Sequence, residues 1–208
     1  MRCLALLGAS GHGKVVADTA ISKGFDEIHF FDDAWPKKTS IGPWSVNGSS
    51  NELIKLMSKF DGVIVSIGNN RIRLEKQQML QNLAVPLLSL IHPSSVVSSF
   101  SKIGQGTFLC AGSIVNVGAE LGDAVIVNTG ATVDHDCLLS EGVHIAPGVH
   151  LSGNVCVGTC SWIGVGASVK QGVKIGSDVI IGAGSVVISD VPDGSTVVGN
   201  PARFISKS

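Results

Sequence analysis

Every sixth residue from Ile91 to Val187 is Ile, Leu or Val, seventeen times in succession and without a change of phase. A period of six fits neither the roughly 3.6 residues per turn of an α-helix nor the alternation of an ordinary β-strand, and it is typical of a parallel β-helix. This feature constrains the fold more than any other in the chain. The aliphatic positions are Ile91, Val97, Ile103, Leu109, Val115, Leu121, Val127, Val133, Leu139, Ile145, Leu151, Val157, Ile163, Val169, Ile175, Ile181 and Val187.

Small or β-branched residues recur four positions after the aliphatic ones, at Ser95, Ser101, Thr107, Ser113, Ala119, Val125, Ala131, Cys137 and Val143. We therefore expect each six-residue segment to form one flat side of a triangular prism. The aliphatic side chain would fill the axis, and the smaller residue would fit the corner. Three segments, about eighteen residues, would complete one coil, so the run supplies nearly six coils.

The composition excludes several functional classes. The chain has 208 residues, with 15 Lys and Arg against 16 Asp and Glu and no basic cluster, so it lacks the charge pattern of a nucleic-acid-binding protein. The apolar run near the N-terminus is too short for a signal peptide, and no stretch approaches the roughly 18 apolar residues of a membrane span. The five cysteines lack CxxC spacing, which predicts free thiols in a cytoplasmic protein.

A different pattern precedes the repeat. It predicts strands at 3–7, 27–31, 62–67 and 87–91, and helices at 14–23, 47–60 and 71–83. Strands that alternate with helices predict a small Rossmann-like parallel sheet. We therefore expect an α/β domain at 1–85 and a β-helix with a C-terminal tail at 86–208, with the boundary near Val85–Pro86. The turn-forming segment 190–194 should end the repeat.

A glycine-rich loop, Gly8-Ala-Ser-Gly-His-Gly13, joins the first predicted strand to the first helix. Glycine lets a phosphate approach the backbone closely, and a helix N-terminus adds N–H donors. Asp32 ends the second strand, where a contact to a ribose or a base is expected. The spacing is GxxGxG rather than the GxGxxG of dinucleotide enzymes, so the loop alone indicates either nucleotide binding or a structural turn.

The densest ionisable cluster in the repeat is Asp134-His135-Asp136. Gly153 follows His135 by eighteen residues, so it should lie directly above His135, one coil spacing of about 4.8 Å away. A histidine that acts as a base, beside a backbone N–H that faces a developing oxyanion, is a plausible acyl-transfer site. A neighbouring carboxylate could fix the histidine tautomer. The competing interpretation is an ordinary surface histidine on a solenoid.

His144 and His150 occupy the same position of consecutive segments. Three histidines on one β-helix raise the possibility of zinc, since trimeric β-helical carbonic anhydrases bind zinc with three histidines. The six-residue spacing does not resemble that arrangement, and we expect no metal.

Several motifs together resemble the hexapeptide-repeat acyltransferases, in particular the bacterial branch of UDP-4-amino-sugar N-acetyltransferases and sialic acid O-acetyltransferases. The repeats alone indicate only the superfamily, whereas the glycine–histidine loop combined with the His-Asp-Cys segment is more specific. The resemblance covers nearly every part of the chain, at residues 8–14, 31–33, 66–70, 91–94, 128–137 and 198–203.

The resemblance implies a left-handed β-helix, a homotrimer with active sites between subunits, and acetyl-CoA as co-substrate. His135 matches the family's general base and Asp136 its acidic partner, while Asn128 and His144 match residues near the reacting groups. Gly153 matches the backbone N–H that holds the thioester carbonyl. Further matches to coenzyme contacts are Ala146, Gly199, Pro201 and Arg203, and the matches to nucleotide-sugar contacts are Ser10, Gly11, His12, Gly13, Asp32, Asp33, Gly68 and Asn69.

The leading hypothesis is acetyl transfer from acetyl-CoA to the 4-amino group of a UDP-linked deoxy sugar, for bacterial surface glycan or glycoprotein sugar synthesis. Within the same family, O-acetylation of sialic acid or another sugar hydroxyl is the alternative. A non-enzymatic trimeric scaffold with a nucleotide-sensing domain leaves the stacking of Gly153 on His135 unexplained. An NAD-dependent enzyme leaves the β-helix without a role.

Overall fold

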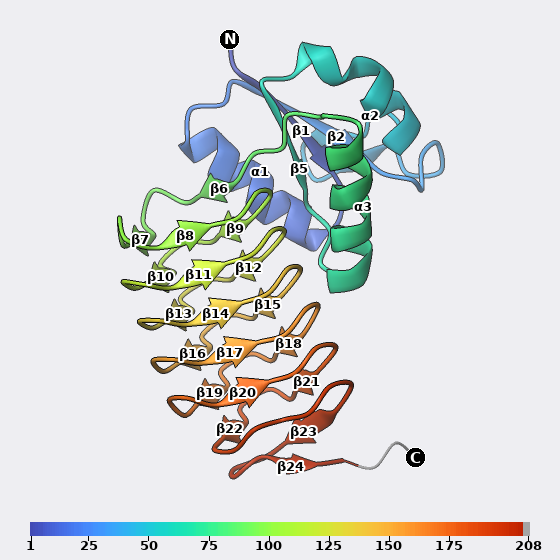
Figure 1. Ribbon diagram of the computed structural model, residues 1–208. Helices are drawn as coiled ribbons and strands as arrows, with labels where there is room; N and C mark the ends of the chain where they lie inside the picture. The colour runs from blue at the N-terminus through green and yellow to red at the C-terminus, as the bar shows by residue number, and fades with distance from the viewer. Residues whose placement is uncertain (206–208) are drawn as a thin grey trace.

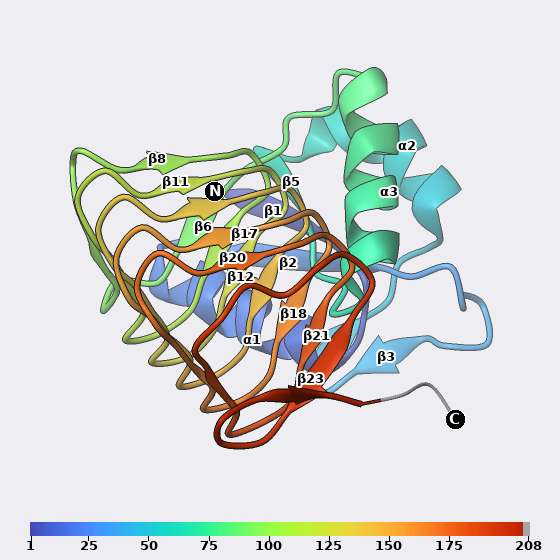
Figure 2. The same ribbon diagram turned by 60° about the horizontal axis from the view of Figure 1, so that its bottom comes forward.

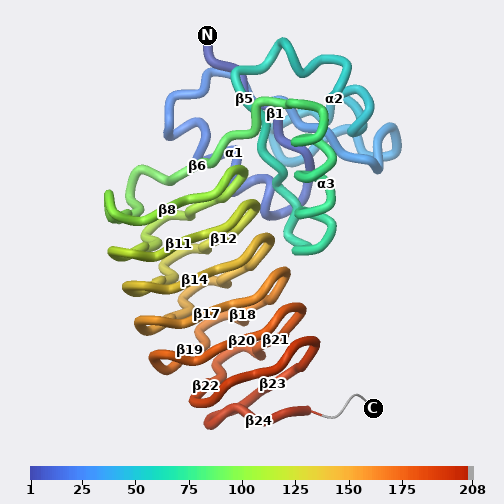
Figure 3. The backbone as a smooth tube through the Cα atoms, in the orientation of Figure 1, coloured from blue at the N-terminus to red at the C-terminus, as the bar shows by residue number. Residues whose placement is uncertain are grey.

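The computed structural model describes residues 1–205 and consists of two parts. Figure 1 shows a small α/β part at the top, from which a solenoid of stacked coils extends downward. The tube in Figure 3 makes the stacking plain, because successive coils follow one another without an interruption. The C-terminal segment lies at the far end of the solenoid from the α/β part.

The α/β part is built on a three-stranded parallel sheet in the order β2-β1-β5. Alternate residues of the central strand face opposite sides: Leu4 and Leu6 pack toward α1, while Ala5 and Leu7 pack with residues of α2 and α3. Both faces are therefore buried, which accounts for the continuous apolar run. The elements are β1 (Cys3–Leu7), α1 (Gly11–Ser22), β2 (Glu27–Phe31), α2 (Ser50–Leu56), a 3₁₀ turn (Met57–Lys59), β5 (Gly62–Val65) and α3 (Asn70–Asn82).

Three details of this part differ from the sequence-based expectation. Helix α1 begins at Gly11, so His12 and Gly13 lie in its first turn rather than in a loop. The expected fourth strand at 87–91 forms only in part: Leu87 makes a single parallel bridge to Val63, the chain then leaves the sheet, and only Leu90–Ile91 is a strand. Leu90 pairs instead with Phe108 of the solenoid. A short hairpin, β3 (Ser40–Ile41) and β4 (Trp44–Ser45), was not expected.

The solenoid confirms the six-residue repeat. Each aliphatic position of the series is the second residue of a two-residue strand, from β6 to β22. Every third strand pairs in parallel, for example Val133 with Leu151, so one coil takes eighteen residues. The aliphatic side chains and the small corner residues form one continuous core along the axis. The uninterrupted phase therefore sets which residues lie above one another.

The three sides of the prism are three sheets. The six-stranded sheet holds β7 (Val96–Val97), β10 (Ile114–Val115), β13 (Thr132–Val133), β16 (His150–Leu151), β19 (Ser168–Val169) and β22 (Val186–Val187). The five-stranded sheet holds β8 (Lys102–Ile103), β11 (Glu120–Leu121), β14 (Leu138–Leu139), β17 (Cys156–Val157) and β20 (Lys174–Ile175). The eight-stranded sheet holds β6 (Leu90–Ile91), β9 (Phe108–Leu109), β12 (Ile126–Val127), β15 (His144–Ile145), β18 (Trp162–Ile163), β21 (Ile180–Ile181), β23 (Thr196–Val198) and β24 (Arg203–Phe204).

The phase changes where the turn-forming segment 190–194 was expected to end the repeat. Val197 of β23 pairs with Ile181, only sixteen residues earlier, and β24 then folds back antiparallel on β23. The tail therefore closes the end of the eight-stranded sheet.

The α/β part covers the other end of the same sheet. Residues of α1 share a core with Leu90, Phe108 and Cys110 of the first coils. Helix α3 runs beside the corner between the five- and eight-stranded sheets, where Leu74 packs with Ala124 and Cys160. Figure 2 shows both helices against one side of the solenoid. No helix within residues 1–205 is long and apolar enough to cross a membrane.

Candidate active site

The histidine–aspartate pair predicted from the sequence lies at the corner between the six- and five-stranded sheets. His135 and Asp136 form the turn between β13 and β14, and Asp136 has a left-handed φ of 57°. The two side chains are joined by a hydrogen bond of 2.8 Å between His135 Nδ1 and Asp136 Oδ2. The aspartate arm is therefore long enough to reach the imidazole, and Nε2 remains free for a substrate.

A second carboxylate fixes the backbone of this turn. The Oδ1 atom of Asp134 accepts a hydrogen bond from the His135 N–H at 2.8 Å and another from the Asn116 side chain at 2.8 Å. The hydrogen bond to Asp136 raises the pKa of His135 above the ordinary 6.5, against partial desolvation. With Nδ1–H donated to Asp136, the free Nε2 carries the lone pair of a general base.

Gly153 lies one coil further along, as the register predicted. Its backbone faces the imidazole so closely that a Cβ there would overlap the ring and come within 3.0 Å of His135 Cδ2. The neighbouring Asn154 N–H donates to the His135 carbonyl at 2.9 Å. Gly153 is buried, and among residues 1–205 its N–H donates no hydrogen bond. The His135 imidazole and the backbone of Gly153 are therefore in close contact.

Asn128 and His144 form a second cluster, on the eight-stranded sheet below the α/β part. Asn128 Nδ2 lies 3.1 Å from His144 Nε2, and its Oδ1 accepts from the Thr129 N–H at 2.8 Å. This orientation makes His144 Nε2 an acceptor and places its proton on Nδ1. His12 faces His144 from the first turn of α1, with 6.4 Å between ring centroids.

The two facing imidazoles are held in the neutral form. Burial, together with the charge of Arg73, lowers the pKa of His12 to about 4 and that of His144 to about 3. His12 Nε2 is buried and has no hydrogen-bond partner within residues 1–205. His144 meets the Gly68 backbone, which acts against the lowering of its pKa. Buried polar atoms are normally satisfied, so His12 Nε2 indicates a place for a ligand group or water.

Three of the candidate nucleotide-sugar contacts, Ser10, Asp32 and Asp33, line a cavity of about 220 Å³ at the end of the sheet of the α/β part, whereas Gly11, His12, Gly13, Gly68 and Asn69 lie outside it. Asp32 accepts a hydrogen bond from the Ala9 N–H at 2.8 Å and so holds the glycine-rich loop in place. Burial alone would raise the pKa of Asp33, but hydrogen bonds from Lys76 and Ser50 lower this pKa to about 2. The lining residues are Leu7, Gly8, Ser10, Asp32, Asp33, Ile67, Ile72 and Lys76.

The glycines of the loop have different roles. A Cβ at Gly13 would approach the Gly8 carbonyl oxygen to 2.5 Å, so Gly13 is needed for α1 to pack against the sheet. Gly11 and Gly68 have open space around the Cβ position, which leaves their backbone accessible to a ligand. Asn69 caps helix α3, since its Oδ1 accepts from the Ile72 N–H at 3.0 Å.

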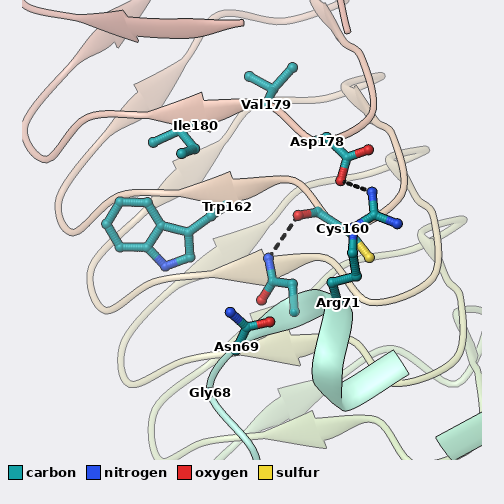
Figure 4. Close-up of a pocket in the computed structure, with 9 residues that line it drawn as sticks. Gly68, Asn69, Arg71, Cys160, Trp162, Asp178, Val179 and Ile180 are labelled. Carbon is teal, nitrogen blue, oxygen red and sulfur yellow. Dashed lines mark hydrogen bonds and ion pairs between the residues drawn. The ribbon is translucent and has the colours of Figure 1, made fainter. Parts of the chain in front are cut away.

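A groove continues along the eight-stranded sheet beyond His144. Figure 4 shows Trp162 and Ile180 on one side of it and Cys160, Asp178 and Arg71 on the other. Its volume is about 310 Å³, and Gly68 and Asn69 lie at the end of the groove that is lower in Figure 4. Trp162 and Ile180 lie one and two coils below His144 in the same column.

The remaining candidate coenzyme contacts are spread along the solenoid. Ala146 is buried at the turn after β15, and its N–H donates to Ile163 at 3.0 Å. Gly199 accepts from the Val186 N–H at 3.0 Å, and Pro201 lies between it and Arg203. Arg203 is exposed on β24. These residues form no single pocket with Gly153.

A single chain does not bring all the candidate catalytic residues together. His135 lies at the corner between the six- and five-stranded sheets, whereas His144 lies on the eight-stranded sheet. In a triangular prism, the corner between the six- and five-stranded sheets is opposite the side formed by the eight-stranded sheet. His135, Asp136 and Gly153 therefore form one cluster, and Asn128, His144 and His12 form another on the far side of the coil.

Sequence reasoning did not find Arg73, Lys76 or Trp162. The signal for Trp162 was present, because the residue before each aliphatic position faces outward and those of one sheet recur every eighteen residues. Arg73 and Lys76 carried no such signal, because a helix rich in polar residues does not show which face meets another domain. Within residues 1–205, no group of three or more His, Cys, Asp or Glu side chains could hold a metal ion.

This chain is similar to several known proteins. The family model described as the PglD N-terminal domain matches residues 3–80. A UDP-N-acetylbacillosamine N-acetyltransferase from Bacillus subtilis (strain 168) is 36% identical over 113 residues, which are 53% of this chain. The match spans about half of that curated relative, 52% of its length.

Two solved structures match over nearly the full chain. The acetyltransferase domain of PglB from Neisseria gonorrhoeae FA1090, in complex with acetyl coenzyme A, is 47% identical, with a TM-score of 0.93 over 98% of this chain and 99% of that one. A variant of the GDP-perosamine N-acetyl transferase from Caulobacter crescentus, in complex with CoA and GDP-perosamine, is 35% identical, with a TM-score of 0.93 over 98% of this chain and 97% of that one.

Proposed function

This chain belongs to the PglD family of hexapeptide β-helix sugar N-acetyltransferases, and we propose from that premise that it transfers the acetyl group of acetyl-CoA to the amine of a nucleotide-linked amino sugar. The observation that carries the proposal is the hydrogen-bonded His135–Asp136 pair set against the unpaired N–H of Gly153. The matching relatives are named as N-acetyltransferases, which favours an amine over the hydroxyl of the O-acetylation alternative.

The reaction needs a base and a site for negative charge. The amine nitrogen attacks the thioester carbonyl carbon, and His135 Nε2 takes the proton that the nitrogen loses. The carbonyl oxygen becomes negative and accepts a hydrogen bond from the Gly153 N–H. The C–S bond then breaks, and the thiolate takes the proton from His135 and leaves as CoA. Because both substrates are bound at once, no covalent enzyme intermediate is needed.

We propose that the acceptor is a UDP-linked deoxy sugar with a 4-amino group. The cavity beside Asp32, Asp33 and Lys76 would hold the nucleotide, and the open backbone at Gly11 and Gly68 would lie near the diphosphate. His12, His144 and Asn128 would face the sugar. Acetyl-CoA would extend from Gly153 past Ala146 toward Gly199, Pro201 and Arg203. The five free cysteines support a cytoplasmic location.

We further propose that the active protein is a homotrimer of left-handed β-helices, with each site between two subunits. The placement of His135 opposite the sheet that carries His144 supports this arrangement, because one chain alone cannot present both to one sugar. In a closed ring, the corner of one subunit would instead meet the eight-stranded sheet of the next.

A mixing experiment tests the shared site. His135→Ala and His144→Ala should each be nearly inactive alone. When the two variants are unfolded and refolded together, about one quarter of the sites in random trimers would combine an intact His135 with an intact His144. Recovery of roughly that fraction of activity supports a shared site. A mixture as inactive as its parents, although light scattering shows mixed trimers, contradicts it.

The acceptor is tested by measuring thiol release from acetyl-CoA with a series of acceptors. We expect release with a UDP-4-amino sugar, less with a GDP-4-amino sugar, and least with free or CMP-linked sialic acid. Equal or faster release with sialic acid would replace N-acetylation with the O-acetylation alternative.

A further inference from the structure

Arg73 is the largest fully buried side chain in the protein, with 1% of its surface exposed. It projects from α3 into the seam between the α/β part and the solenoid. Its Nε donates to the Ala124 carbonyl at 2.8 Å and its Nη2 to the Gly142 carbonyl at 2.8 Å. These two carbonyls belong to equivalent corners of successive coils.

The same guanidinium also holds the α/β part. Nη1 donates to the carbonyls of Ile67 at 3.0 Å and Gly68 at 3.2 Å, and Nη2 lies 3.1 Å from the Asn70 side-chain oxygen. The planar guanidinium therefore joins two coil corners to the Ile67–Gly68 loop. Gly68 of this loop lines the groove that lies beyond His144. No carboxylate within residues 1–205 pairs with Arg73.

A buried cation held only by carbonyl dipoles keeps its full charge, and nearby groups respond to it. The titratable groups that face it are His12 from α1, His144 from β15 and Cys160 from the corner after β17. Cys160 in turn faces Arg71, Asp178 and Glu141. After burial, the charge of Arg73 is the next largest cause of the low pKa of both imidazoles.

We propose that Arg73 is a positioning residue for acetyl transfer: its guanidinium fixes the seam across which His12 faces His144, and its charge adds to burial in favouring the neutral form of both imidazoles. Neutrality matters at His144 because Nε2 must keep its lone pair to accept the hydrogen bond from Asn128. Protonated His144 would lose that bond and would place a second cation beside Arg73. The proposal rests on the proposed function, since it assigns a role to Arg73 in that reaction.

The test uses three variants of the full chain. Arg73→Gln keeps an amide donor in the seam but removes the charge, and Arg73→Lys keeps the charge but loses the planar fork. Gln77→Leu is the matched control, because Gln77 is also fully buried on α3 and donates across the same seam to the Gln105 carbonyl at 2.6 Å. It removes one hydrogen bond of the seam without changing the charge there.

The first measurement is an NMR titration of labelled histidines, which reads the charges whether or not the protein is an acetyltransferase. In Arg73→Gln, the pKa of His12 and that of His144 should both rise, whereas in Arg73→Lys and Gln77→Leu both should stay as in the wild type. Unchanged values in Arg73→Gln would overturn the proposal. If Arg73→Gln does not fold, the wild-type titration decides, because an ordinary pKa at either imidazole would equally overturn it.

The second measurement is the pH profile of kcat/KM for the nucleotide sugar. The ratio of wild type to Arg73→Gln should be larger near pH 5.5 than near pH 8, since protonation of His144 would add to the loss. For Gln77→Leu, a lower melting temperature with a pH-independent ratio is expected. A pH-independent ratio for Arg73→Gln as well would reduce Arg73 to a purely structural residue.

Discussion

Replacing Gly153 with alanine changes the active-site corner by one methyl group. The new Cβ would overlap the His135 ring and come within 3.0 Å of its Cδ2, so the imidazole must move. The ring is free to move outward because 49% of the His135 side chain is exposed. The backbone at Gly153 is not in the left-handed region, so alanine is compatible with the local conformation. We therefore expect a folded protein with a displaced base.

The size of the effect follows from that displacement. A shift of about 1 Å in a reacting group costs on the order of 10²-fold, and loss of a general base about 10²–10⁴-fold. Gly153→Ala should thus lower kcat about 10²-fold, while the melting temperature of the solenoid changes little. Ser152→Ala, one residue earlier on the same turn, is the control for a small change in side-chain size at this corner.

A double-mutant cycle decides whether the alanine acts through the histidine. If it acts only by moving the ring, Gly153→Ala should cost nothing further in a His135→Ala background. Thiol release from acetyl-CoA under saturating substrate provides the rates. If the two losses multiply instead, the methyl group obstructs the acetyl group or the N–H directly, and the argument from contact with His135 is wrong.

Asp136→Asn should shift the acid limb of the kcat/KM profile to lower pH, because the hydrogen bond to Asp136 is what raises the pKa of His135; an unshifted limb would show that His135 is not the titrating group. His12 and His144 have pKa values of about 4 and about 3 in the folded protein and protonate on unfolding, because an unfolded histidine has a pKa near 6.5. The free energy of unfolding should therefore fall by about 2 kcal/mol per imidazole between pH 7 and pH 5, with no such loss at pH values above 6.5. Urea denaturation at each pH measures this change. One residue inserted after Leu139 should unfold the coils that follow it. A complete eighteen-residue coil inserted at the same place should fold, but the protein should be inactive because the extra coil separates Gly153 from His135. Circular dichroism measures the folding of each variant, and thiol release measures its activity.

The solenoid was predictable because its core repeats in one dimension. A strict six-residue phase leaves only one way to bury every aliphatic side chain, so Ile91 to Val187 define both the strands and the register. The stacking of Gly153 on His135 follows from that register. The end of the repeat was also visible, because the segment 190–194 interrupts the phase.

The α/β part was less predictable because its details depend on contacts distant in sequence. Leu87–Ile91 has the composition of a strand, but Leu90 pairs with Phe108 of the solenoid and not with a strand of the α/β sheet. Buried Arg73 resembles the exposed Arg71 in the sequence, and only the docked solenoid distinguishes them. Asn128 and His144 were grouped with His135 through a family resemblance. His135 and His144 are nine residues apart, half of the predicted eighteen-residue coil, so the register itself places them on opposite sides of the solenoid.

The most direct test of the proposed reaction is the product formed from acetyl-CoA and a UDP-4-amino sugar. We expect one free thiol for each sugar that gains an acetyl group at nitrogen, with His135→Ala slowed by about 10²–10⁴-fold. Full activity of His135→Ala, or thiol release without an N-acetylated sugar, would contradict the account.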